Sequence, residues 1–504
     1  MDLKVARCSS RLLDGRDFQI ACKPWTGQCK RQKQICHSKS HTSNHHSSHA
    51  APSTSLSSEL DTGTKLFKWL QVEGMPEQRV SIQAHERLGQ SLDLTVADRD
   101  LSPGDVALRI PDHLVITLAR VFGDESEAEQ LVAGKHSELA CLALYLMYEK
   151  KQGRNSYWYE FIAELDKQRG RGQMGARSPL IWDEGQAERL LAGSPVLQLI
   201  HERAKAVEKE YAELDTIWFM AASLFKDYPY DVPSETFSLP LFRQAFAAVQ
   251  ASTVHLQGVQ KARRFALVPL GPPLLSYSST SKAMLTWNRE EQEVQLKADR
   301  PYKRGEPVYA WCGPQPNSAL LLNYGIVDED NPYDKLSMTV TIPHQDPLFQ
   351  QKRAILQSHG LATMQKFEFL RHKGIPPMLL PYLRLSYTSD PDMLHRPGFF
   401  NAGPSSDYSE KLALAQLTEY LQQRLSKYCT TISEDNAVVT DPSAGPREKV
   451  AARLLRIEKT ILNDVLDEVE QLPGAPEHLL ASRRGSNMLA GLSEWVHQQA
   501  VKLS

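Results

Sequence analysis

The sequence lacks a strong net charge and long apolar runs, and both absences exclude classes of protein. Its 58 lysines and arginines nearly balance 60 aspartates and glutamates, which leaves a formal net charge of −2. A strongly basic surface for nucleic acids is therefore excluded. The longest apolar run, Leu139 to Tyr148, has ten residues, whereas a membrane-spanning helix needs about 18 or more. We therefore expect no membrane span and interpret this run as a buried helix.

Cysteine is scarce, and common catalytic motifs are missing. The chain has 7 cysteines in 504 residues, and the three beyond residue 58 are dispersed, which favours a reducing compartment without a disulfide framework. They are Cys141, Cys312 and Cys429. There is no serine nucleophile elbow, HExxH or Walker motif. These absences exclude the hydrolases, metalloproteases and nucleotidases that depend on such motifs.

One glycine-rich segment needs a separate interpretation. Residues 170–175 match GxGxxG, but a dinucleotide site needs a strand before this motif and a helix after it. Here a helical pattern precedes it and Ser178-Pro179 follows. We interpret the surrounding basic residues as a mobile basic loop that is either simply solvated or contacts an acidic partner or a nucleic-acid backbone. These residues are Lys167, Arg169, Arg171 and Arg177.

Residues 1–58 differ in composition from the rest of the chain. They carry nine basic and three acidic residues, and serine and histidine are concentrated between 37 and 58. Such a leader resembles an organelle transit peptide, and a disordered tail is the alternative. Four cysteines lie here beside several histidines, but their spacing is wide and no CxxC pair is present, so we predict no metal site. The cysteines are Cys8, Cys22, Cys29 and Cys36.

The rest of the chain alternates between β-like and helical patterns. Residues 75–117 and 262–345 contain short β-like runs separated by turn residues, whereas 135–226 and the region from about 347 onward follow helical periodicity. The stretch 396–407 reads as a loop between helices. Two leucine-rich stripes near the carboxyl end predict packing faces. Their members are Leu414, Leu417, Leu421 and Leu425, then Leu454, Ile457, Ile461 and Val465.

The most informative stretch runs from Cys312 to Ile326 and is followed by Asp330-Asn331-Pro332. Taken alone it predicts a turn, an amphipathic helix and a Tyr-Gly corner. It resembles the carboxyl-terminal signature of SET-domain lysine methyltransferases of the Rubisco-methyltransferase type, Y-G-x-x-S-N-x-E-L-L-L-x-Y-G-F followed by N-P. Further segments resemble this family in the same order, over about residues 64–472. They include Phe67-Lys68-Trp69-Leu70, Ser178-Pro179-Leu180-Ile181-Trp182 and Lys427-Tyr428-Cys429-Thr430-Thr431-Ile432.

The resemblance implies an α+β fold, in which a SET β-domain is interrupted by a helical insert and followed by an all-helical carboxyl-terminal domain. The expected boundaries follow the family's order. They are 1–58 for the leader, 59–345 for the SET domain with its insert at about 118–245, 346–475 for a domain like the Rubisco-methyltransferase substrate-binding domain, and 476–504 for a tail.

The family transfers a methyl group from S-adenosylmethionine to a lysine amine, and no metal is implied. A tyrosine hydroxyl at the lysine channel orients the amine, and the resemblance assigns that role to Tyr324. It assigns close backbone approach to the cofactor to Gly89, in the family's G-x-G turn. Whether the chain is an enzyme depends on the cofactor positions, where several residues depart from the pattern. Leu275 and Ser276 replace Asn-His, Pro272 replaces Asp, Ser252 replaces Arg, and Cys312 replaces Tyr.

One subgroup of the family shares these departures: the SET-domain proteins of the plastid transcriptionally active chromosome. This resemblance implies a chloroplast protein of the stroma and nucleoid, associated with the plastid-encoded RNA polymerase and contacting nucleic acid indirectly. The first hypothesis is a scaffold with a degenerate methyltransferase site, and the alternative is an active lysine methyltransferase. The scaffold hypothesis predicts that Leu275, Tyr277 or Trp311 fills the cleft beside Tyr324.

Overall fold

The structure is a computed structural model. It describes residues 61–87, 90–122, 137–168, 174–220, 238–256, 259, 263–396, 398, 400–401 and 407–476. The chain divides into two compact units, one formed by Met1–Glu59 with Asp215–Val232 and one by Leu60–Leu214 with Pro233–Ser504. In the first unit, the structure describes only the end of helix α7. The expectations for the leader, for Gly89, for residues 169–173 and for the tail beyond residue 476 concern positions outside the described residues.

The strands between residues 80 and 311 form several small sheets, as the β-like runs predict. β1 and β2, of eight residues each, make an antiparallel hairpin. β9 lies between β3 and β8, β6 lies between β4 and β5, and β7 pairs in parallel with β10. The bounds are β1 Val80–Arg87, β2 Gln90–Ala97, β3 Val106–Pro111, β4 Ile116–Thr117, β5 Thr253–His255, β6 Phe265–Leu267, β7 Ser276–Ser278, β8 Leu285–Asn288, β9 Glu293–Lys297 and β10 Tyr309–Trp311.

Helices interrupt these strands between β4 and β5. The apolar run Leu139–Tyr148 lies in α4, where Leu142, Leu146 and Met147 are buried. The α4 helix begins where the Ser137 side chain accepts a hydrogen bond from the amide of Ala140. No described helix is long and apolar enough to cross a membrane. The bounds are α2 Leu118–Phe122, α4 Glu138–Gln152, α5 Tyr159–Gln168, η3 Pro179–Ile181, α6 Gln186–Leu190, α7 Val196–Met220 and α8 Leu239–Ser252, while α1, Thr62–Val72, precedes β1.

The carboxyl-terminal region is helical apart from one strand. Strand β12 pairs antiparallel with β11 inside the region that the sequence predicts as all-helical. The prediction was wrong there because Phe367 and Phe369 point inward at every second position, which is a strand periodicity. The bounds are β11 Lys335–Thr341, α10 Phe349–Ser358, β12 Met364–Leu370, α11 Leu379–Tyr387, α12 Pro391–Leu394, α13 Asp407–Leu425, α14 Ile432–Thr440 and α15 Pro446–Gln471.

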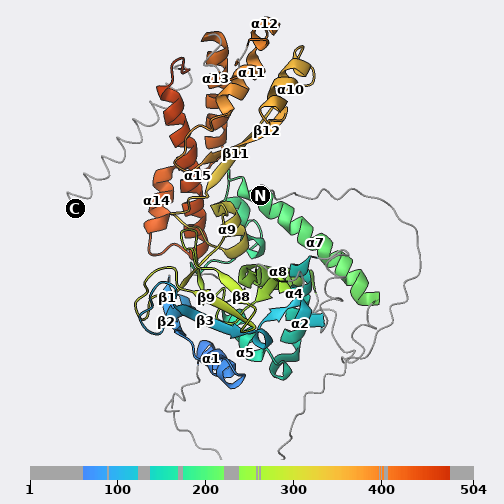
Figure 1. Cartoon of the computed structure of the whole chain (residues 1–504), viewed down its shortest axis with the longest axis vertical. Coiled ribbons are helices and arrows are strands. Elements are labelled where there is room, and N and C mark those ends of the chain that lie inside the picture. Colours follow the sequence, from blue (N-terminus) through green and yellow to red (C-terminus); the bar gives the residue numbers. More distant parts are fainter. Residues whose placement is uncertain are drawn as a thin grey trace, which may run out of the picture. The chain divides into compact units, whose positions relative to one another are not determined.

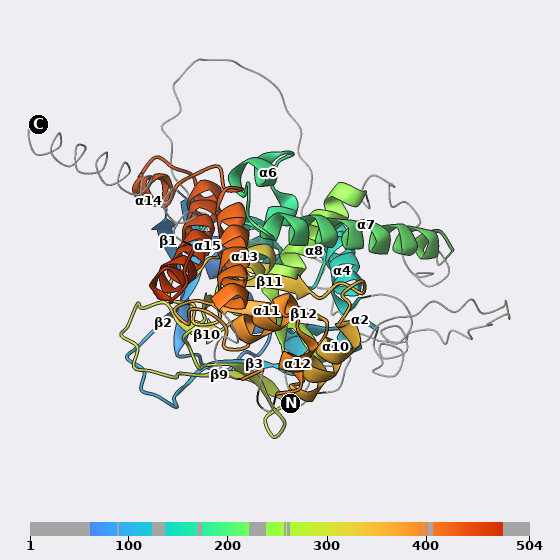
Figure 2. The same ribbon diagram turned by 90° about the horizontal axis from the view of Figure 1, so that it is seen from above.

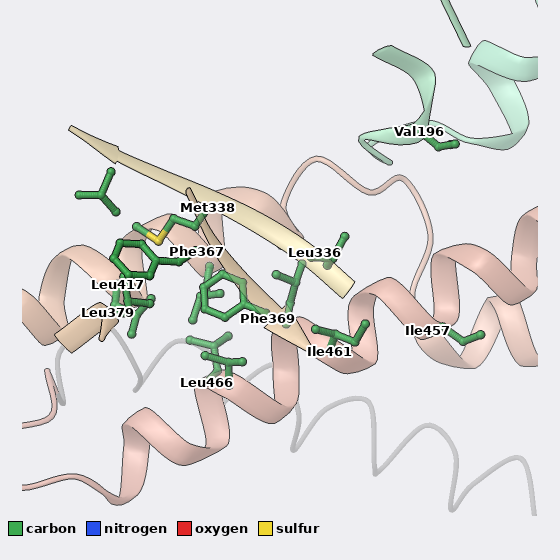
Figure 3. Packing of buried hydrophobic residues seen from close by; sticks show 14 of the residues in the cluster. Val196, Leu336, Met338, Phe367, Phe369, Leu379, Leu417, Ile457, Ile461 and Leu466 are labelled. Atoms are coloured by element: carbon green, nitrogen blue, oxygen red, sulfur yellow. The ribbon is translucent and has the colours of Figure 1, made fainter. Parts of the chain in front are cut away.

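Helices α11, α13 and α15 lie beside the β11–β12 ribbon in both views (Figure 1, Figure 2). Of the two predicted stripes, all members are buried except Leu425, which is partly buried. They join the inner face of the ribbon in one apolar core (Figure 3). This core also includes Trp182 and Val196 from the helical insert and Leu321 and Leu322 from the helix before Tyr324. Burial of these side chains therefore holds the carboxyl-terminal helices against the rest of the second unit.

Candidate active site

Tyr324 is the last residue of helix α9 (Asn317–Tyr324). Gly325 follows it in the left-handed conformation, with φ of 67°, and ends the helix. A Cβ atom at this glycine would lie 2.6 Å from the carbonyl oxygen of Ala176, so the Tyr-Gly corner requires glycine both for its conformation and for its close approach to the insert. The local sequence thus fixes where the Tyr324 side chain emerges.

A buried polar network holds the start of the same helix. The Asn317 side chain is fully buried, donates to Asp334 at 2.6 Å and to the carbonyl of Asp328 at 3.0 Å, and accepts from the amide of Asp328 at 2.9 Å. Asn331, from the predicted Asn-Pro pair, donates to the carbonyl of Gln315 at 2.8 Å. The asparagines of the motif therefore tie the loop after α9 back to its first turn.

Tyr324 is surrounded by apolar, aromatic and sulfur-containing groups. Its ring centroid lies 4.8 Å from that of Tyr277, and both rings pack against a small cluster formed by Cys312, Leu320 and Ile326. Burial raises the pKa of the Tyr324 hydroxyl, and raises that of Tyr277 well above its ordinary value. Both phenols are therefore neutral.

The Tyr324 hydroxyl accepts a long hydrogen bond from the side-chain amide of Gln315, at 3.4 Å. The same amide group donates to the backbone carbonyl of Cys312 at 2.6 Å, and Asn323 donates to the side-chain oxygen Oε1 of Gln315 at 3.1 Å. Gln315 thus positions the hydroxyl weakly while it braces the turn before α9. No sequence pattern predicts these contacts of Gln315, because they form only in the folded turn.

Leu275 and Ser276, which stand in place of the family's Asn-His signature, are buried, and the residues just before them are hydrogen-bonded to strand β2. Leu275 and Ser276 are each 2% exposed. The Thr95 side chain donates to the carbonyl of Leu270 at 2.8 Å, and its amide donates to the carbonyl of Leu274 at 2.9 Å. The fold therefore brings strand β2 against residues 270–274.

Ser252, in place of the family's arginine, ends α8 and is 1% exposed. Its hydroxyl donates to the carbonyl of Ala248 at 2.7 Å, within its own helix. A serine bonded in this way cannot offer the charged, forked donor that an arginine presents. Together with the apolar Leu275, it provides no charged side chain at two of the positions that the resemblance assigns to the cofactor.

The three residues expected to fill the cleft lie in different places. Tyr277 packs on Tyr324. Leu275, two residues before Tyr277 in the chain, is buried. The Trp311 ring instead faces Tyr333, with 6.4 Å between centroids. Burial also raises the pKa of Cys312 to about 12, so this thiol is protonated and unreactive. Among the described residues, no group of three or more metal-ligating side chains could hold an ion.

A charged cluster near strand β2 was not predicted from the sequence. Lys167 donates to Asp61 and to the fully buried Asp93, each at 2.6 Å. Glu164 accepts from Thr62 at 2.6 Å, and burial raises its pKa to about 7. The lysine that the sequence places in a basic loop therefore joins α5 to β2 and to the residue before α1. No sequence motif marks this pairing, because its members lie far apart in the chain.

A second buried polar cluster joins the helical insert to the carboxyl-terminal helices. The Glu458 carboxylate accepts from the hydroxyls of Ser194 and Tyr428, each at 2.9 Å. Gly193 lies against this joint, since a Cβ atom there would meet the carbonyl of Lys427 at 2.4 Å. Burial raises the pKa of Glu458 to about 7. The segments around Ala192–Ser194 and Lys427–Ile432, which both resemble the family, therefore meet in space.

Comparisons with known proteins agree with this architecture. Residues 343–462 match the family described as Rubisco LSMT substrate-binding. The chain is 25% identical over 438 residues, 82% of its length and 84% of the relative's, to a chloroplastic [fructose-bisphosphate aldolase]-lysine N-methyltransferase of Arabidopsis thaliana. It is also 25% identical, over 83% of each chain, to the chloroplastic Rubisco large subunit N-methyltransferase of Pisum sativum.

Solved structures show the same fold. The structure titled "Structure of Rubisco LSMT bound to AdoMet" superposes with a TM-score of 0.64 at 23% identity, and covers 82% of this chain and 92% of that one. Over most of its length the chain is therefore similar to SET proteins of the Rubisco-methyltransferase type. Its mixed helix-and-strand fold, with a helical carboxyl-terminal region, was correctly predicted. The SET relatives named here are N-methyltransferases of proteins.

Proposed function

We propose that this SET protein is a chloroplast scaffold that binds other proteins and has a weakened methyl-donor site. The observation that carries the proposal is the packing of Tyr277 on Tyr324, with ring centroids 4.8 Å apart. An aromatic side chain in this place occupies space beside the hydroxyl that would orient a lysine amine. Chloroplast localisation is supported by the transit-like leader and by relatives whose names are chloroplastic.

The cofactor positions support the same proposal through their energetics. A charge-assisted hydrogen bond contributes about 1.5–3 kcal/mol, so serine in place of arginine at position 252 weakens donor binding by about one to two decades. Leu275 and Ser276 remove further side-chain contacts. Since these losses are not additive, we expect a total of about two to four decades.

We propose the plastid-encoded RNA polymerase and its associated proteins as the partner, in the stroma or nucleoid. This follows from the resemblance to the subgroup of the plastid transcriptionally active chromosome. The near-neutral net charge of −2 disfavours strong direct DNA binding, so contact with nucleic acid is indirect. The carboxyl-terminal domain and the helical insert supply the contact surface.

Calorimetry with S-adenosylmethionine tests the donor site. We expect no heat of binding for the natural chain at millimolar donor. A restored variant that combines Ser252→Arg, Leu275→Asn and Ser276→His should bind more tightly if these positions still line the site. Micromolar binding by the natural chain would overturn the proposed weakness. Recovery of the tagged full chain from chloroplasts without polymerase subunits would overturn the proposed partner.

An active protein-lysine methyltransferase is the second candidate. Tyr324 favours it, because the tyrosine of the family motif is present at the end of α9 and, among the described residues, its hydroxyl has a long contact of 3.4 Å with Gln315. The departures at Ser252, Leu275 and Ser276 count against it. Transfer of labelled methyl groups to chloroplast proteins, abolished by Tyr324→Phe, would establish this function in place of the scaffold.

A further inference from the structure

The helical insert contains a pocket that is distinct from the surroundings of Tyr324. It lies between α4, α5, η3 and α8. Its volume of about 520 Å³ is within the range of ligand pockets. Its lining includes no residue of the Tyr324 cluster and none of the carboxyl-terminal region. No family motif marks it, and the proposed scaffold role places a contact surface on the insert without naming this pocket.

The floor of this pocket is apolar. Leu146 and Met147 of α4 and Ile162 and Leu165 of α5 line it and are almost fully buried. At the edge, Leu241 in the first turn of α8 is 41% exposed. An exposed leucine beside an apolar floor is typical of a surface that gains free energy when a second apolar group covers it.

The rim of the pocket is mainly basic. Lys150, Lys151 and Arg177 contribute three cations, and Asp166 contributes one carboxylate. Lys150 pairs with Asp166 at 2.7 Å, and both side chains are more than half exposed. Arg177 belongs to the basic segment that the sequence analysis identified. The rim therefore attracts acidic groups around an apolar floor.

We propose that this pocket binds a segment of a partner protein in which apolar side chains alternate with acidic ones. A small molecule is usually enclosed over most of its surface. Here Lys150, Asp166, Gln244 and Leu241 are all exposed at the mouth, which leaves much of a ligand in solvent. A helix or strand that inserts an apolar anchor and places carboxylates on the rim fits this arrangement.

The proposal is independent of methyl transfer and of the identity of the polymerase. A chain that binds no S-adenosylmethionine, or no polymerase subunit, can still bind an acidic segment here. The experiment below therefore fails or succeeds separately from those of the proposed function.

Fluorescence anisotropy of the full chain with a labelled peptide tests the proposal. The probe is a fluorescein-labelled amphipathic peptide with leucine and phenylalanine on one face and glutamate on the other, and the control peptide has lysine in place of glutamate. We expect binding of the acidic peptide only, weakened by salt. Leu241→Asp should weaken it about tenfold or more, and Lys150→Glu about threefold to tenfold.

Matched variants on α7 serve as controls. Leu199 is 42% exposed, so Leu199→Asp matches Leu241→Asp. Lys209 is exposed and pairs with Glu213, as Lys150 is exposed and pairs with Asp166, so Lys209→Glu matches Lys150→Glu. Both control variants should keep the natural affinity. If circular dichroism shows that Leu241→Asp does not fold, the comparison of Lys150→Glu with Lys209→Glu tests the proposal.

Three outcomes overturn the proposal. The acidic peptide could produce no change in anisotropy, the lysine peptide could bind equally well, or the control variants could lose as much affinity as the pocket variants. Dodecanoate, which joins an apolar tail to one carboxylate, separates the remaining alternative. If it binds at micromolar concentration and the acidic peptide does not, the pocket is a small-molecule site.

Discussion

Tyr324 at the end of α9 and Tyr428 between α13 and α14 are both largely buried, but their hydroxyl groups have different surroundings. Tyr428 donates to Glu458 at 2.9 Å, in a cluster that also holds Ser194. Tyr324 has a contact of 3.4 Å with Gln315 and lies against the ring of Tyr277. One tyrosine belongs to a tight polar network, and the other belongs to an aromatic and apolar cluster.

This difference indicates which interactions the fold depends on. At Tyr428, buried polar groups join the insert to the carboxyl-terminal helices, and loss of one partner would leave the others unsatisfied. At Tyr324, the hydroxyl has a long contact with Gln315, so we expect its loss to cost little stability. Measurements at the two regions should therefore separate structural from functional roles.

The largest expected effect is at Gly193, beside Tyr428. Gly193→Ala forces a side chain into the left-handed conformation and against the carbonyl of Lys427 at 2.4 Å, so we expect a loss of about 4 kcal/mol in unfolding free energy. Gly185→Ala is the matched control, because Gly185 also has positive φ but has nothing within 4 Å of a Cβ atom. It should cost about 1 kcal/mol. Urea unfolding measures both, and equal losses would contradict the close joint.

Glu458 provides a pH test of the same joint. Burial raises the pKa of its carboxyl from 4.5 to about 7, so the unfolded chain releases this proton first as pH rises. The folded state therefore loses about 3 kcal/mol of stability between about pH 4.5 and pH 7. Glu458→Gln should remove that part of the slope in unfolding free energy against pH. Glu164, whose pKa is also raised to about 7, titrates in the same range, so only the difference between natural chain and variant is informative. An unchanged slope would refute the assignment.

The two tyrosines can be compared directly by removing each hydroxyl. Tyr428→Phe leaves Glu458 without one of its donors and should cost about 1–3 kcal/mol in unfolding free energy. Tyr324→Phe removes only a long contact and should cost less than about 0.5 kcal/mol. Thermal or urea unfolding of the two variants checks this order. A larger loss at Tyr324 would mean that its hydroxyl is structural.

The smallest expected effect is a difference in thiol reactivity between the same two regions. Cys312, beside Tyr324, is 6% exposed and its pKa is raised by burial to about 12. Cys429, next to Tyr428, is exposed. Iodoacetamide at neutral pH should therefore modify Cys429 and spare Cys312 in the folded chain, as peptide mass spectrometry can show. Rapid modification of Cys312 would indicate that the Tyr324 cluster opens in solution.

Much of the fold could be predicted because its elements have strong local patterns. The strand at Val106–Pro111 and the buried stripe of α15 follow from period-2 and period-3.6 burial. Strand β12 was missed because only two phenylalanines mark its inner face, and short strands between helices give weak signals. The rest of the β11–β12 pairing depends on contacts that a local pattern does not contain.

The candidate site was predictable in part. The Cys312–Ile326 motif located Tyr324, because the resemblance assigns a role to that position. The roles of Gln315 and Lys167 could not be found, since each depends on partners that only the fold brings near: the hydroxyl of Tyr324 and the buried carboxylate of Asp93. The pocket in the insert was equally hidden, because its lining comes from four separate segments.

Helix α9 has a practical consequence for anyone who dissects this chain. Leu320 packs in the small cluster beside Tyr324, whereas Leu321 and Leu322 belong to the large core shared with the carboxyl-terminal helices. A shortened protein that stops before that core would expose both leucines to water, and we expect it to aggregate. The half of the chain that carries Tyr324 is therefore best produced and assayed only as part of the intact polypeptide.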